Sequence, residues 1–254
     1  MSLYELTFSP TGGTQTVADL FARALGGGAS PVDLTDGDAD FGQYAFSADD
    51  LCVVAVPSFG GRVPAAALSR LGKMSGGGAR AVLVAVYGNR AYDDTLLELK
   101  DALQGAGFRC AAAVAAVAEH SIMRQFGAGR PDAEDERELA GFAEEIRAAL
   151  ASGAPLGDLA VPGNRPYRAY KGVPMKPKAG KGCTGCGLCA ARCPVGAIPK
   201  DRPAETDGDR CISCMRCVAI CPSGARGVSK LVLAAGAQKM KKACAGRKPN
   251  ERFL

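Results

Sequence analysis

The sequence contains no tryptophan and a single histidine, and aromatic residues make up only 6% of its 254 residues. Its abundant alanine and glycine favour helices packed closely on a sheet over a bulky aromatic core. No stretch approaches the roughly 18 uncharged apolar residues of a membrane-spanning helix. The first residues include neither a basic nor an apolar segment, so no signal peptide is predicted and we expect a cytoplasmic protein.

Cysteine, in contrast, is abundant, with eleven residues. Eight of them form a pattern that occurs twice, C-x2-C-x2-C-x3-C followed by proline. This is the spacing with which bacterial ferredoxins hold two [4Fe–4S] clusters, the fourth cysteine of each run ligating the other cluster. The spacing predicts one cluster on Cys183, Cys186, Cys189 and Cys221, and another on Cys193, Cys211, Cys214 and Cys217.

Two other readings of these cysteines are a zinc ribbon and a disulfide framework. A zinc ribbon uses two C-x2-C pairs and leaves the third cysteine of each run unexplained, together with Pro194 and Pro222. Disulfides need an oxidising compartment, to which nothing in the sequence points. Cys52 and Cys110 lie in apolar runs, and we expect them to be buried small hydrophobic residues.

Residues 1–152 alternate between apolar runs and helical patterns. Apolar runs at 3–8, 31–34, 51–56, 81–86 and 108–118 predict five strands, and helical patterns occur at 14–25, 64–71, 93–104 and 131–150. This alternation predicts an α/β fold with a five-stranded, doubly wound parallel sheet in the flavodoxin-like order 2-1-3-4-5, with 108–118 as its edge strand.

The remaining residues divide into three parts. Residues 153–181 are rich in proline, glycine, lysine and arginine, which is typical of a linker. Residues 182–227 predict a small α+β ferredoxin domain whose core is the two clusters. Residues 228–254 predict a C-terminal helix and a basic tail, which we expect to be mobile or to lie on a partner.

The loop after the first predicted strand has the features of a phosphate site. Ser9, Thr11 and Thr14 flank Gly12 and Gly13 immediately before a helix. Free amides and the helix dipole favour an anion there, and without a following Gly-Lys-Ser/Thr this is not a Walker loop. We expect a monophosphate held by neutral donors, as in flavodoxins that bind FMN. The alternative is a capped helix start in an ordinary α/β protein.

Three further loops lie at the same edge of the predicted sheet. A flat isoalloxazine needs a slot flanked by aromatic residues or glycine, with backbone amides along its pyrimidine edge. Each aromatic residue is as readily a core or surface residue, and the single histidine as readily a satisfied loop residue. The candidates are Pro57, Phe59, Gly60, Gly61, Tyr87, Gly88, Asn89, Tyr92 and His120.

Together these segments resemble the flavodoxin–ferredoxin fusion proteins of anaerobic bacteria and archaea. The resemblance rests on residues 9–14, 59–64 and 87–94 and on the doubled cysteine run, and it covers about residues 3–226. It implies an N-terminal flavodoxin-like domain with FMN and a C-terminal ferredoxin with two [4Fe–4S] clusters. The chain departs from ordinary flavodoxins in having no tryptophan to stack on the flavin.

The sequence thus predicts an electron-transfer protein that passes electrons between two clusters and an FMN, joining one-electron to two-electron carriers. Two alternatives stay open: a flavin-dependent reductase of a small molecule, and a ferredoxin with a flavin-free, flavodoxin-like docking domain. No dinucleotide motif follows a strand and no nucleophile–base pair stands out, so no dedicated substrate site is predicted.

Charge is divided unevenly along the chain. Residues 1–150 carry a net charge of −8 and residues 151–254 a net charge of +13. The basic part lacks the interleaved aromatic residues that stack on bases, so we expect no nucleic-acid partner. An acidic redox partner protein, or the acidic N-terminal part itself, is favoured instead. A homodimer stays open.

Overall fold

The computed structural model describes residues 2–152 and 158–254. The five apolar runs form strands β1 (Leu3–Thr7), β2 (Ser30–Asp33), β3 (Leu51–Pro57), β4 (Arg80–Tyr87) and β5 (Arg109–Val117). They pair in parallel in the order β2-β1-β3-β4-β5, which confirms the predicted order. The central strands β3 and β4 are buried on both faces, and this is why their sequences are continuous apolar runs.

The edge strand was predicted wrongly. A short strand near the C-terminus, β8 (Glu251–Phe253), pairs antiparallel with β5, Ala113 lying opposite Phe253. Within the described residues the sheet therefore has six strands and is mixed, and β5 is an inner strand. β5 is buried from Ala112 to Val117, so its outer backbone groups need a partner other than water, and β8 supplies it.

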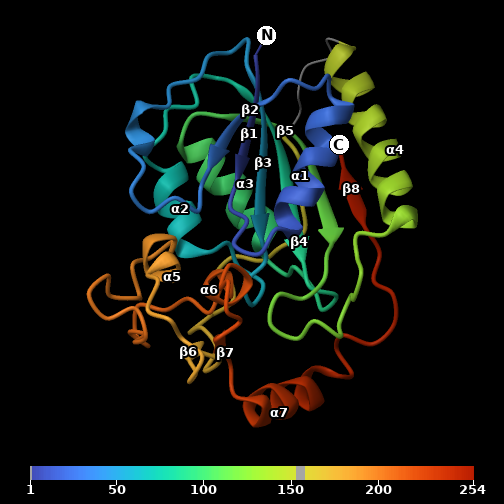
Figure 1. Cartoon of the computed structure of the whole chain (residues 1–254). Helices are drawn as coiled ribbons and strands as arrows, with labels where there is room; N and C mark the ends of the chain where they lie inside the picture. The colour runs from blue at the N-terminus through green and yellow to red at the C-terminus, as the bar shows by residue number, and fades with distance from the viewer. Residues whose placement is uncertain (1, 153–157) are drawn as a thin grey trace.

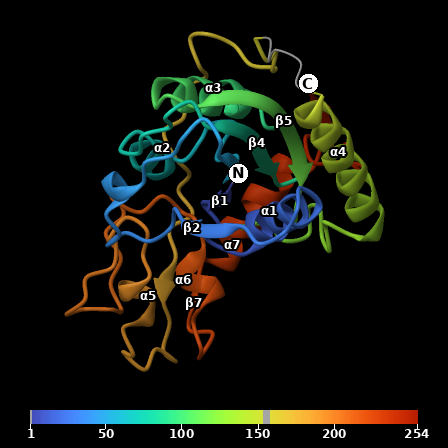
Figure 2. The same ribbon diagram turned by 90° about the horizontal axis from the view of Figure 1, so that it is seen from above.

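Helices cover both faces of the sheet, as predicted. On one face lie α1 (Gly13–Ala24) and α4 (Ala133–Ala151), and on the other α2 (Ala65–Leu71) and α3 (Thr95–Gly105). Figure 2 looks across these layers, with the curved sheet between the two helix pairs. A 3-10 helix, η1 (Phe41–Gln43), closes the α2–α3 side. No helix among the described residues is long and apolar enough to cross a membrane.

The cysteine-rich segment forms a small unit at the carboxyl ends of the strands (Figure 1). Its first and last segments, β6 (Lys178–Ala179) and β7 (Arg226–Gly227), pair antiparallel. Between them lie two single-turn helices, α5 (Leu188–Ala191) and α6 (Arg216–Ala219). The predicted C-terminal helix is α7 (Lys230–Met240), which lies below the sheet in Figure 1. We call residues 178–227 the cluster unit and the sheet with its helices the sheet domain.

The segments on either side of the cluster unit lie on the sheet domain. In the predicted linker, of which residues 153–157 lie outside the described residues, the backbone amide of Asn164 donates to Asp94 (2.8 Å) and Arg165 pairs with Asp101 (2.5 Å). The basic tail does not extend away from the chain, because it returns to the sheet domain and ends in β8. The described part of the tail thus packs on its own chain.

Candidate functional site

The eight predicted cysteine ligands lie in two groups of four, each around a small cavity. Each group combines three cysteines of one run with the fourth of the other, which is the grouping expected from the spacing. Within the described residues no three His, Cys, Asp or Glu side chains converge on one point as ligands of a single ion. The inner group is Cys193, Cys211, Cys214 and Cys217, and the outer group is Cys183, Cys186, Cys189 and Cys221.

Left-handed backbone turns bring the sulfurs of each group together. Gly187 (φ 75°) and Met215 (φ 63°) occupy the same place in the two runs, immediately before α5 and α6. Gly185 (φ 71°) and Ser213 (φ 56°) match in the same way. A non-glycine residue in this region costs about 1–2 kcal/mol, so the second run adopts the shape of the first at some expense in stability.

The two groups differ in their exposure to water. Burial raises the pKa of the Cys214 thiol to about 12 and that of Cys217 to about 11, because an isolated thiolate is poorly solvated there. In the outer group a hydrogen bond from Ser223 lowers the pKa of Cys221 to about 7, and Cys186 is exposed. Since iron would deprotonate a coordinating thiol outright, the inner group would depend more on the charge of a bound metal to hold its thiolates.

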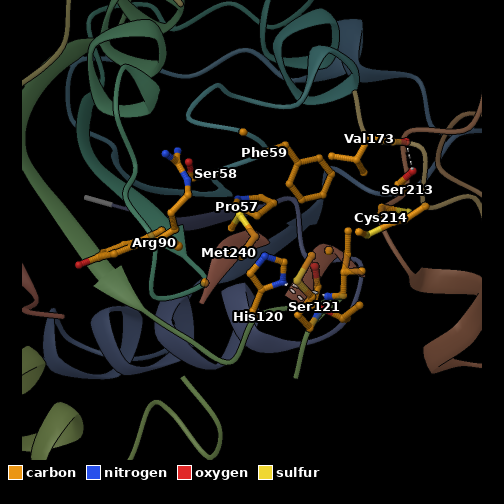
Figure 3. Close-up of a pocket in the computed structure, with 18 of the residues that line it drawn as sticks. Pro57, Ser58, Phe59, Arg90, His120, Ser121, Val173, Ser213, Cys214 and Met240 are labelled. Atoms are coloured by element: carbon orange, nitrogen blue, oxygen red, sulfur yellow. Dashed lines mark hydrogen bonds between the residues drawn. The ribbon is translucent and has the colours of Figure 1, made fainter. Parts of the chain in front are cut away.

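A cavity of about 720 Å³ lies between the carboxyl ends of the strands and the cluster unit (Figure 3). The loops after β1, β3, β4 and β5 form one side of it. Residues 168–175, residues 212–214 and helix α7 form the other side. Cys214 of the inner group is therefore part of the wall, and Figure 3 shows it beyond Phe59. One space thus joins the rim of the sheet to a cysteine of the inner group.

Most of the predicted flavin-binding residues line this cavity. They are Thr11, Gly13, Thr14, Pro57, Phe59, Gly60, Tyr87, Gly88 and His120. Four of the others have different contacts: the Ser9 hydroxyl accepts from the Gln15 amide (2.9 Å), Gly61 packs against Asp93, Tyr92 donates to Glu251 (2.7 Å), and Asn89 binds the C-terminal tail. Gly12 (φ 97°) is the residue before α1 and does not line the cavity.

The first loop leaves hydrogen-bond donors free at the start of α1. No side chain caps the start of α1, and the Gln15 amide is used by Ser9. Within the described residues, the amides of Gly13 and Thr14 are therefore left without a protein acceptor, as expected in a first helical turn. Both residues line the cavity, and Thr14 adds a hydroxyl beside them. Free amides, a hydroxyl and the positive end of the helix dipole thus meet at one point.

His120 lies in the cavity wall with its ring facing inward (Figure 3). Its Nδ1 accepts hydrogen bonds from the amides of Ile122 (3.1 Å) and Met123 (3.2 Å). Burial lowers the pKa of the imidazole, and these two bonds need a lone pair on Nδ1. The ring is therefore neutral with its proton on Nε2, which leaves an N–H donor for a ligand.

Several cavity residues were not found from the sequence. Tyr170 and Val173 come from the predicted linker, and Val232, Gly236 and Met240 from α7. The only local sign of their role was the aromatic residue Tyr170 within a segment of linker composition. The ring of Tyr170 lies on Gly60 (φ 61°) so closely that a Cβ there would be 2.3 Å from Tyr170 Cδ2. These residues reach the cavity only because both flanking segments fold back on the sheet domain.

Comparison with known proteins shows what the cysteine-rich segment is similar to. Residues 182–225 match the family of the 4Fe-4S dicluster domain. In both of its parts the chain resembles a flavodoxin–ferredoxin fusion. Its N-terminal part carries the strand order 2-1-3-4-5 and its C-terminal part the 4Fe–4S domain, so the predicted resemblance is confirmed. The match to the 4Fe–4S dicluster domain supports an electron-transfer role.

Solved structures similar to the fusion match its flavodoxin-like part. A flavodoxin of Streptococcus pneumoniae is 21% identical, with a TM-score of 0.42 over 58% of this chain and 99% of that one. Megasphaera elsdenii flavodoxin is 15% identical (TM-score 0.37, 57% and 98%), and an azoreductase of Bacillus anthracis 11% (TM-score 0.36, 59% and 99%). Such low similarity establishes no shared activity. A comparison with curated proteins gave no match.

Proposed function

We propose that this fusion passes electrons between a partner protein, two [4Fe–4S] clusters and one FMN. The observation that carries the proposal is the place of Cys214, which belongs to the inner cysteine group and to the wall of the cavity beside the anion-binding loop. When bound, each cluster carries one electron at a time and FMN one or two, so that one-electron and two-electron carriers are joined.

The cysteine groups fit two clusters. Each cavity is lined by four cysteine sulfurs, one for each iron of a cubane. Three of the four sulfurs lie in one short loop. The inner group also receives backbone support, since the amide of Ala197 donates to Cys193 Sγ (3.2 Å) and that of Ser213 to Cys211 Sγ (3.4 Å). Such donors stabilise anionic sulfur ligands.

The large cavity fits FMN. Free amides and hydroxyl groups at Gly13 and Thr14 suit a phosphate, and the rings of Phe59 and Tyr170 offer apolar faces in place of the missing tryptophan. The His120 Nε2–H is a neutral donor within the wall. A pocket of about 720 Å³ lies in the range that small-molecule cofactor sites occupy.

The exposure of the two groups suggests the order of the carriers. The inner group borders the flavin cavity, and the outer group meets solvent at Cys186 and at Leu188, which is 39% exposed. Lys181 and Arg192 are exposed on the same loops. We infer that a partner with an acidic contact surface docks at the outer group, and that electrons pass between it and FMN through the inner group.

The test is anaerobic reconstitution of the full chain, followed by assays of iron, sulfide and flavin. We expect two clusters and one FMN per chain, with FMN bound at least tenfold more tightly than riboflavin, which has no phosphate. Thr14→Val should reduce this preference. Thr16→Val should not, because Thr16 is exposed and does not line the cavity. No bound flavin would favour the docking-domain alternative, and flavin bleaching by NAD(P)H alone would favour the reductase.

A further inference from the structure

At one buried position the two cysteine runs differ in charge. Counting from the fourth cysteine, Cys193 and Cys221, the runs continue Pro-Val-Gly-Ala-Ile and Pro-Ser-Gly-Ala-Arg. Ile198 therefore corresponds to Arg226, and both are buried, with 4% and 3% exposure. Ile198 packs in an apolar cluster with Cys189 and Ala190. A guanidinium at the matching place in the second run needs an explanation, because an unpaired buried cation is costly.

The contacts of Arg226 hold its guanidinium against the outer group. Its Nε donates to Cys189 Sγ at 3.2 Å. The other nitrogens donate to the Thr206 hydroxyl (2.8 Å), to the Glu205 carbonyl oxygen (3.0 Å) and to the carbonyl oxygen of Pro203. None of these partners is a carboxylate, so they fix the orientation of the side chain without neutralising its charge.

Cysteine sulfurs that hold a cluster would supply the compensating negative charge. Arg226 lines the outer cavity together with Cys189 and Cys221. The hydrogen bond of the guanidinium is thus directed to the outer group.

We propose that Arg226 raises the reduction potential of the outer cluster relative to the inner cluster. Reduction of a cluster adds one electron and no proton, so the site gains one negative charge. A buried cation and an N–H···S bond stabilise that charge more in the reduced than in the oxidised state, which raises the potential. Ile198 offers the inner group neither, so the duplicated loops hold clusters of unequal potential. The inference rests on the two clusters of the proposed function.

The test is a redox titration of the reconstituted full chain, followed by EPR. Arg226→Ile copies the other run, and Arg226→Lys keeps the charge without the guanidinium fork. Signals of the two clusters are assigned with Cys221→Ser, which lacks an outer ligand. For Arg226→Ile we expect the reduced-to-oxidised ratio of the outer cluster at a fixed potential to fall at least tenfold, or ~59 mV for one electron. The inner cluster should shift less, and Arg226→Lys should restore most of the change.

Each outcome decides the inference. If Arg226→Ile does not assemble its outer cluster, Arg226→Gln is compared with Arg226→Lys, and a lower potential in the glutamine variant supports the role of charge. Equal potentials in a fully loaded pair overturn it. Loss of the outer cluster in every variant assigns Arg226 a purely structural role and also overturns it. If the wild-type chain holds no clusters, both the inference and the proposed function fail. If the clusters are present but the Arg226 variants leave their potentials unchanged, only the inference fails.

Discussion

The side-chain amide of Asn89 donates a hydrogen bond to the backbone carbonyl of Cys244 at 2.9 Å. The same nitrogen reaches the carbonyl of Gly246 (2.8 Å), and Oδ1 accepts from the Lys248 amide (3.2 Å). Asn89 has a φ of 58°, a conformation that asparagine adopts more readily than most residues. A residue at the rim of the sheet thus fastens the C-terminal tail.

Asn89→Ala should loosen the tail. It leaves the carbonyl groups of buried Cys244 and of Gly246 without their donor and places alanine at a left-handed φ, so we expect a loss of about 1–3 kcal/mol in the free energy of unfolding. Amide exchange of residues 244–253 should become faster. Asn89→Gly is the control, because it accepts the φ and isolates the loss of the side-chain bonds. Unchanged exchange in both variants would show that the tail is held by other contacts.

Cys193 and Cys221 lie in opposite groups, which gives a paired prediction. Cys193→Ala should disturb the cluster of Cys211, Cys214 and Cys217, and Cys221→Ala the cluster of the other run. Each variant should retain roughly half of the iron, because one cluster keeps all its ligands. EPR of the reduced variants should show complementary losses. Loss of the same signal in both variants is the contrary result.

The ring of Tyr170 covers the loop after β3 at Gly60. Gly60→Ala imposes a left-handed φ of 61° on alanine and puts its Cβ into the ring, so we expect a loss of stability of about 1–2 kcal/mol from the backbone alone. Displacement of Tyr170 should also weaken FMN binding, measured by flavin fluorescence. Gly105→Ala, at the end of α3 with open space around its Cβ, should be neutral for both. Equal behaviour of the two variants would contradict this role of Gly60.

His120 predicts an acid-dependent loss of stability. Burial lowers the pKa of the folded imidazole below its ordinary value of 6.5, so the unfolded chain binds the proton more tightly. The contribution of His120 is fully present above about pH 6.5 and is lost as the pH falls toward the folded pKa. His120→Asn keeps an acceptor for the amides of Ile122 and Met123 but does not titrate. Unfolding free energies of the two proteins should therefore converge between pH 7 and pH 5, and parallel curves would refute the prediction.

The sequence predicted the parallel sheet because the central strands β3 and β4 are continuous apolar runs, and runs of this kind are local features. The cysteine grouping was predictable for the same reason, since the spacing itself imposes the geometry. β8 was missed because three residues, only one of them apolar, carry no local signal and become a strand only beside β5. Tyr170 and Met240 were missed likewise, as their place in the cavity depends on contacts distant in sequence.

The return of the chain to β5 makes the cluster unit an insertion within the flavodoxin-like domain, since β8 completes the sheet only after the last cysteine has passed. A domain joined by one linker must find its docking position by diffusion, whereas a domain joined at both ends stays close to the cavity at the carboxyl ends of the strands. The rate of electron exchange between the cluster unit and the sheet domain should then be independent of solvent viscosity. A single proteolytic cut in either of the two segments that join them should make this rate depend on viscosity.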